Sequence, residues 1–146
     1  MSHKPQVLIV EDSLLTALEM QLALEEAGYR VLGPAASYER AMGLVDAFQL
    51  DIVLLDIELS GPKNGVAVAR ELLKRHIPAL FVSAITPNDP EARKSAVGIL
   101  SKPIDAERLI DSVEAVQEIS AGKTPSSLPS GFERYDWRPV RIGEIA

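Results

Sequence analysis

The chain has 146 residues, and 15 lysine and arginine residues against 21 aspartate and glutamate residues give it a net charge of −6. This length fits one domain, so we expect no separate effector domain within it. The absence of cysteine excludes disulfides, thiolate metal sites and thiol nucleophiles, and the acidic balance argues against direct nucleic-acid binding, which needs clustered lysine and arginine. No apolar run approaches the roughly 18 residues of a membrane span, and residues 1–6 lack the apolar part of a signal peptide, so we expect a cytoplasmic protein without membrane contact.

Short apolar blocks alternate with segments of helical period along the chain. Each block predicts a strand, because it is too short for a helix and several are rich in β-branched residues. Their near-continuous apolar character indicates strands covered on both faces, as in a parallel sheet. The predicted strands are Val7–Val10, Val31–Leu32, Ile52–Leu55, Ala79–Val82 and Ile99–Leu100.

The first predicted helix follows the first strand. It starts behind Asp12 or Ser13 as the N-terminal cap and ends at Gly28. Its apolar stripe consists of Leu14, Leu18 and Leu22, with Leu15 beside them.

Three further helices are predicted from apolar stripes that open at Ser37, Asn64 and Asp105. The stripes are Ala41, Leu44, Val45 and Phe48; Val66, Ala69, Leu72 and Leu73; and Leu109, Val113 and Val116. Between the fourth and fifth strands, Pro87 and Pro90 delay any helix, so only a short one is expected near residues 91–95.

Strand and helix therefore alternate five times, ending near Ala121, which predicts a doubly wound α/β sheet with helices on both faces and a shortened fourth helix. We expect residues 1–121 to form this domain and residues 122–146 to form a linker and a C-terminal extension. The extension holds three of the seven aromatic residues, Phe132, Tyr135 and Trp137. It either docks on the domain or across a dimer, or it is a frayed terminus.

Polar residues follow four of the predicted strands. In doubly wound sheets the carboxyl ends of the strands meet at one edge, where ligands bind. We therefore expect one site that contains Glu11, Asp12, Asp56, Ser83 and Lys102.

The predicted site suits phosphoryl transfer. Three clustered carboxylates repel one another unless a cation neutralises them, and Mg²⁺ prefers such oxygen ligands. Asp56 lies nearest the middle of the sheet and can act as a nucleophile toward phosphorus. Lys102 would supply a second cation to the transferred group, and Ser83 would donate a hydrogen bond to it.

The strand-end segments resemble the receiver domain of two-component response regulators. The resemblance covers residues 6 to about 120 and is carried by Val7–Asp12, Ile52–Asp56, Phe81–Ala84 and Leu100–Pro103. It implies a flavodoxin-like, five-stranded parallel sheet with strand order 2-1-3-4-5.

The same resemblance implies a role for each site residue. Asp56 would be the phosphoacceptor, and Ser83 and Lys102 would contact the phosphoryl group. The Lys102–Pro103 bond would be cis. The implied Mg²⁺ ligands are Glu11, Asp12, Asp56 and the backbone carbonyl of Glu58.

Besides the shortened fourth helix, two features depart from the family pattern. Ile99 occupies a switch position that is usually aromatic and that responds, together with Ser83, to the phosphoryl group. The loop after Asp56 is one residue longer before Gly65 than is usual. In that loop the side chain of Glu58 either influences the lifetime of the phosphorylated state or is a solvated charge.

We therefore expect a single-domain response regulator that takes a phosphoryl group on Asp56 from a histidine kinase or phosphotransfer protein and signals to a downstream protein target. It would catalyse only its own phosphorylation and dephosphorylation and would not be a turnover enzyme. The main alternative is a phosphorylation-independent interaction or dimerisation module on the same fold. A hydrolase with Asp56 as nucleophile is a third option, for which no general acid is found. The oligomeric state stays open, with a homodimer as one option.

Overall fold

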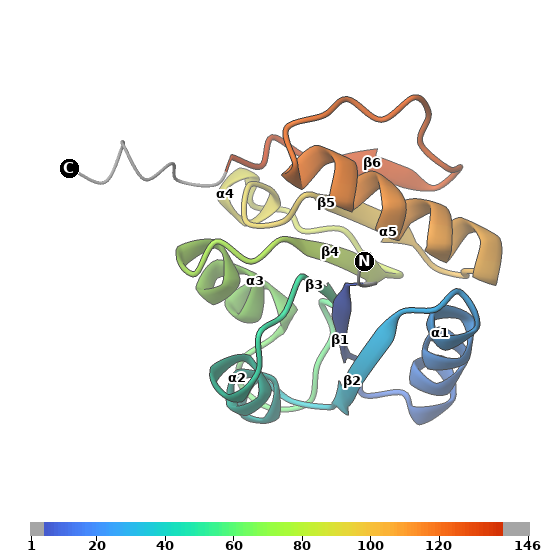
Figure 1. Cartoon of the computed structure of the whole chain (residues 1–146). Helices are drawn as coiled ribbons and strands as arrows, with labels where there is room; N and C mark the ends of the chain where they lie inside the picture. The colour runs from blue at the N-terminus through green and yellow to red at the C-terminus, as the bar shows by residue number, and fades with distance from the viewer. Residues whose placement is uncertain (1–4, 139–146) are drawn as a thin grey trace.

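The computed structural model describes residues 5–138, and six strands form one sheet of order β2-β1-β3-β4-β5-β6 (Figure 1). The strands are β1 (Gln6–Val10), β2 (Arg30–Ala35), β3 (Ile52–Leu55), β4 (Ala79–Ser83), β5 (Gly98–Ser101) and β6 (Phe132–Arg134). The first five are parallel, which confirms the predicted doubly wound fold and its strand order. A sixth strand that was not predicted, β6, adds to these five antiparallel to β5.

In the described part of the chain, five helices surround the sheet: α1 (Leu14–Glu26), α2 (Tyr38–Ala47), α3 (Gly65–Lys74), α4 (Pro90–Arg93) and α5 (Ala106–Ser120). Helices α1 and α5 cover one face, and α2 and α3 cover the other (Figure 1). The four longer helices begin directly after the predicted N-cap residues, whose side chains accept hydrogen bonds from backbone N–H groups. These residues are Ser13, Ser37, Asn64 and Asp105. The predicted shortening of the fourth helix is confirmed, since α4 has four residues. No helix within residues 5–138 is long and apolar enough to cross a membrane.

The core lies in two layers, one on each face of the central strands. β3 and β4 are buried throughout, and β1 is buried from Val7 onward. This burial confirms that the apolar blocks of the central strands are covered on both faces. β2 is only partly buried because it lies at the edge of the sheet.

The leucine stripe of α1 does not face this core, as such a stripe ordinarily would. The side chains of Leu14, Leu15, Leu18 and Leu22 are 66%, 70%, 43% and 62% exposed. The buried side is formed by Ala17, Met20 and Leu24. At 100° per residue these two sides lie opposite each other, so α1 has two apolar faces and periodicity alone does not choose between them.

One member of the second stripe also lies outside the core. Phe48 is the residue that ends α2, with an extended backbone, and its side chain is 47% exposed. The helical period no longer applies at this residue, so its side chain does not continue the face formed by Ala41 and Val45.

The C-terminal extension returns to the edge of the sheet after a loop that follows α5 (Figure 1). We call residues 131–137 the strap. The Ser101 N–H donates to the Gly131 carbonyl, and the Tyr135 N–H donates to the Val97 carbonyl, both at 2.9 Å. Tyr135 and Trp137 are buried, Tyr135 in the core layer beneath α2 and α3 and Trp137 in the layer beneath α1 and α5.

Arg108 of α5 fixes the start of the strap. Its guanidinium group donates to three backbone carbonyls at 2.8–3.1 Å, namely those of Ser130, Pro103 and Ser101. One side chain thus ties the loop before the strap to the end of β5 and to the β5–α5 connection.

Candidate functional site

The polar strand-end residues meet at one edge of the sheet. Glu11 and Asp12 follow β1, Asp56 follows β3, Ser83 ends β4 and Lys102 follows β5. Because β1, β3, β4 and β5 are adjacent and parallel, their carboxyl ends open into one shared site.

Asp56 lies at the centre of the site and is 6% exposed. Its Oδ2 accepts a hydrogen bond from Lys102 Nζ at 2.9 Å, and its Oδ1 accepts one from Ser83 Oγ at 2.9 Å. Lys102 Nζ also donates to Glu11 Oε1 at 2.6 Å. Lysine and serine therefore hold different oxygens of one carboxylate, while the same lysine bridges to a second carboxylate.

The carboxylates fit a small divalent cation. One ligand atom each from Glu11, Asp12 and Asp56 lies within 4.8 Å of the others. Glu11 and Asp56 are buried, and Asp12 is exposed at the mouth. Hard oxygen donors with one side open to water are the set that Mg²⁺ prefers.

Glu58 lies at the same mouth. Its backbone N–H donates to Asp56 Oδ1 at 3.1 Å, and the residue is exposed. The predicted role of its backbone carbonyl as a metal ligand stays a prediction, and so does an effect of its side chain on the phosphorylated state.

Burial and ion pairing shift the pKa values of Glu11 and Lys102 in opposite directions. Burial raises the pKa of Glu11, although the hydrogen bond from Lys102 works in the opposite direction. Burial alone would lower the pKa of Lys102, but hydrogen bonds to Glu11 and Asp56, together with their charges, raise it above its ordinary value. Lys102 is thus a fixed cation between two carboxylates.

Ser60 belongs to the site but was not predicted from the sequence. Its Oγ donates to Asp12 Oδ2 at 3.1 Å, and the residue forms an isolated parallel bridge with Ser37, before α2. The rule that located the other residues applies only to strand ends, and Ser60 lies within a loop. The added length of that loop is the only signal for it in the sequence.

The remaining predicted positions lie around the site. Ile99 is 1% exposed and belongs to the same core cluster as Tyr135 of the strap. The Lys102–Pro103 peptide bond is cis, and so is Gly33–Pro34, which was not predicted.

Comparison with known proteins decides the family. The model of the response regulator receiver domain matches residues 7–114. The chain belongs to this family. It is 39% identical over 136 residues to the positive alginate biosynthesis regulatory protein of Pseudomonas aeruginosa. This alignment covers 86% of this chain and 54% of that protein.

Two shorter receivers match over nearly their whole length. PilH of Pseudomonas aeruginosa is 32% identical over 118 residues, which are 76% of this chain and 96% of PilH. The signal receiver domain of a modulated diguanylate cyclase from Desulfovibrio desulfuricans G20 superposes with a TM-score of 0.74 at 33% identity, over 81% of this chain and 97% of that one. By contrast, the chain spans about half the length of several other curated relatives it matches. The comparisons therefore show a two-component receiver domain with the flavodoxin-like fold.

Proposed function

We propose that this receiver accepts a phosphoryl group on Asp56, in the cytoplasm, from a histidine kinase or phosphotransfer protein and in a Mg²⁺-dependent reaction. The observation that carries the proposal is the set of contacts at Asp56: Lys102 on one oxygen, Ser83 on the other, and two more carboxylates beside it. A carboxylate that served only the fold would not need a lysine shared with a second buried carboxylate.

The proposed step is an in-line displacement at phosphorus. A carboxylate oxygen of Asp56 attacks the phosphorus atom of a phosphohistidine, a P–O bond forms, and the P–N bond breaks. The bonding electrons leave with the imidazole nitrogen of the donor, which is neutralised by a proton. Lys102 and Ser83 reorient toward the oxygens of the incoming group and stabilise its charge.

Glu11, Asp12 and Asp56 would hold the metal ion. When bound, Mg²⁺ supplies positive charge that neutralises the phosphoryl oxygens during transfer. The ammonium group of Lys102 lies between Asp56 and Glu11. The proposed site would thus contain two cations, the ammonium group of Lys102 and the bound Mg²⁺.

The exposed leucine face of α1 supports a protein as the phosphoryl donor. We call Leu14, Leu15, Leu18 and Leu22 the α1 leucine face. The helix begins two residues after Asp12, so the Leu14 end of this face lies next to the site. A contiguous exposed apolar surface of this kind is typical of a protein interaction site.

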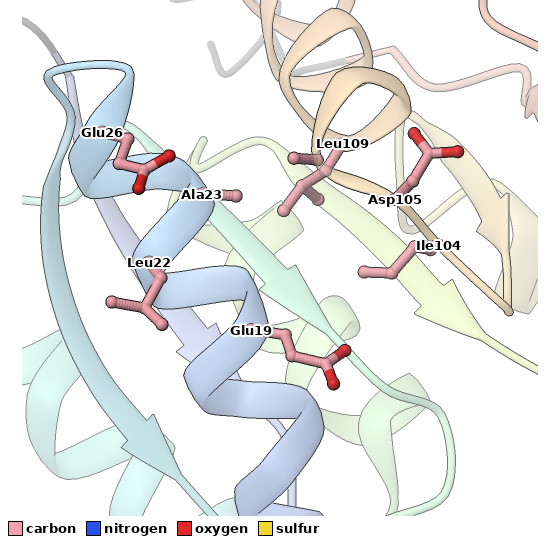
Figure 2. A pocket seen from close by; sticks show the side chains of 8 residues that line it. Glu19, Leu22, Ala23, Glu26, Ile104, Asp105 and Leu109 are labelled. Carbon is pink, nitrogen blue, oxygen red and sulfur yellow. The ribbon is translucent and has the colours of Figure 1, made fainter.

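A groove beside this face extends the surface toward α5. It has a volume of about 350 Å³ and lies between α1 and the start of α5 (Figure 2). Leu22, Ala23, Ile104 and Leu109 are apolar residues that line it, and the acidic residues Glu19, Glu26 and Asp105 line it as well (Figure 2). Such a surface suits a helix of the donor protein with an apolar side and basic flanks.

Phosphorylation would be the signal and not a step in turnover. The phosphoryl group would change the positions of Ser83 and the loop after it, which alters a surface that a downstream protein recognises. The protein would be phosphorylated and would slowly lose the group by hydrolysis, without processing a further substrate.

Acetyl phosphate tests this proposal without a partner protein. The protein is incubated with acetyl phosphate and Mg²⁺, and its intact mass is followed together with the release of inorganic phosphate. We expect a mass gain of one phosphoryl group, lost when Mg²⁺ is chelated and lost in Asp56→Asn. A protein that never gains this mass would contradict the proposal and favour the phosphorylation-independent interaction module. Rapid, continuing release of phosphate would favour a hydrolase.

A further inference from the structure

The strap buries two polar groups that have no partner. Tyr135 is 8% exposed and Trp137 is 9% exposed. Within residues 5–138, Tyr135 Oη and Trp137 Nε1 are the buried side-chain polar atoms that lack a hydrogen bond. Water would satisfy both groups if the strap left the sheet. Burial of the two rings stabilises the docked strap, and the two unpartnered polar groups destabilise it. The free energy of docking is therefore less favourable than ring burial alone would give.

Few backbone bonds hold the strap. β6 has three residues, of which Glu133 and Arg134 are exposed, and it pairs with β5 at the edge of the sheet. A short edge strand of this kind can open while the remaining sheet stays folded. The strap therefore has two states available, docked and released.

A series of contacts leads from the strap to Asp56. The strap is bonded to the segment that follows α4: the Tyr135 N–H donates to the Val97 carbonyl at 2.9 Å, and the Ala96 N–H donates to the Arg93 carbonyl at 3.4 Å. Arg93 Nε also donates to the Pro87 carbonyl at 3.0 Å, which fixes the loop between β4 and α4.

The other end of that loop is anchored at the site. Ser83, the last residue of β4, donates from Oγ to Asp56 Oδ1 at 2.9 Å and accepts from the Ile85 N–H at 3.3 Å. A change in the position of Ser83 is therefore passed to the loop and, through the Pro87 carbonyl, to Arg93.

We propose that phosphorylation of Asp56 releases the strap. This inference rests on the proposed phosphoacceptor function. A phosphoryl group on Asp56 takes over the hydrogen bond of Ser83, and the loop after β4 follows Ser83. Arg93, which is bonded to that loop, then shifts the end of α4 and the Val97 carbonyl to which Tyr135 is bonded. The released strap then uncovers the edge of β5 and the apolar surface under Tyr135 and Trp137. In the unphosphorylated protein the strap is an autoinhibitory cover over that surface.

The test uses the whole chain with Mg²⁺ and beryllium fluoride, which mimics a phosphoryl group on a carboxylate. Trp137 is the only tryptophan, so its emission reports on the strap directly. Fluorine NMR reports whether the mimic is bound. We expect the emission to shift to the red and the amides of Ser101 and Tyr135 to exchange on the order of tenfold faster.

Two substitutions on α4 test the route. Arg93→Met removes the side chain that bonds α4 to the Pro87 carbonyl, so the bound mimic should release the strap less. Lys94→Met removes a neighbouring exposed charge and should respond like the original protein.

Three results would overturn the inference. Bound mimic with an unchanged strap would contradict the coupling alone, and an unchanged response in Arg93→Met would contradict its route. Absence of a bound fluorine signal would contradict the phosphoacceptor function together with the coupling.

Discussion

Lys102 is the residue on which the geometry of the site most depends. It is the cation shared by Glu11 and Asp56, at 2.6 Å and 2.9 Å. Without it, two buried carboxylates would face each other uncompensated. Buried pairs of this kind are costly to break from one side, since the remaining charge keeps its desolvation penalty.

Lys102→Met should therefore destabilise the metal-free protein. The methionine keeps the apolar stem and removes the ammonium group. We expect the free energy of unfolding, measured by urea denaturation with Mg²⁺ chelated, to fall by about 3 kcal/mol. Added Mg²⁺ should restore more stability to the variant than to the original protein, because the ion then neutralises carboxylates that have lost their lysine.

The control for this experiment is Lys123→Met, at an exposed lysine that follows α5. Its unfolding free energy should stay within about 0.5 kcal/mol of the original. An equal loss with and without Mg²⁺ in Lys102→Met would show that the lysine does not balance the metal ligands.

At this scale the sequence predicts most of the site. Glu11, Asp12, Asp56, Ser83 and Lys102 could be located because parallel strands end at a common edge, so position along each strand translates into position in space. Ser60 could not be located in this way, because the path of a loop depends on contacts such as its bridge to Ser37.

Among the elements, α1 shows which features of a helix the sequence predicts and which it does not. The start of the helix could be predicted, because Ser13 caps it. The buried side could not, since both sides of α1 carry apolar residues and the sheet accepts only one. An apolar face left over on an otherwise well-packed helix is more informative about partners than about the fold.

Leu18→Glu tests the α1 leucine face. Leu18 is 43% exposed, so the substitution should leave the free energy of unfolding within about 0.5 kcal/mol of the original. Phosphorylation by acetyl phosphate should also be unchanged. Phosphoryl transfer from a cognate donor protein, identified by phosphotransfer profiling, should slow by on the order of tenfold or more, since a charge would replace an apolar contact.

Leu128→Glu is the matched control, because Leu128 is 38% exposed and lies in the loop after α5. Transfer to this variant should proceed as in the original protein. Equal transfer rates for both variants would mean that the donor docks elsewhere.

β6 is the strand that the sequence did not predict. It has three residues, two of them charged, and so it lacks the apolar block that marks the other strands. Its place beside β5 depends instead on Gly98. A Cβ atom at Gly98 would overlap the Glu133 carbonyl oxygen and press on the ring of Phe132.

Gly98→Ala should therefore displace β6. We expect a red shift of Trp137 emission and a loss of unfolding free energy of about 1–3 kcal/mol, as is usual for overpacking. Gly43→Ala is the control, because a Cβ there meets nothing within 4 Å and a helical alanine gains roughly 0.5–1 kcal/mol over glycine. A Gly98→Ala protein with unchanged emission and stability would show that the strap does not need this close approach.

On the scale of the whole molecule, the receiver fold can be predicted from the order of the elements. The docked position of the strap cannot be predicted in this way. Alternating strands and helices with short connections admit few topologies, and the observed sheet is the expected one. The strap depends on side-chain fit at one edge, in particular on Tyr135 and Trp137, and the sequence left open whether these aromatic residues dock or belong to a frayed terminus. The molecule is therefore a receiver whose C-terminal extension contributes to its core.

The central claim is that Asp56 itself carries the phosphoryl group. Borohydride reduces an aspartyl phosphate to homoserine and leaves free carboxylates unchanged, so peptide sequencing after reduction identifies the modified residue. After treatment with acetyl phosphate and Mg²⁺, we predict homoserine at position 56 and aspartate at every other aspartate position, including Asp12. Homoserine at another position, or aspartate retained at position 56 in protein that has gained the mass of a phosphoryl group, would contradict the account.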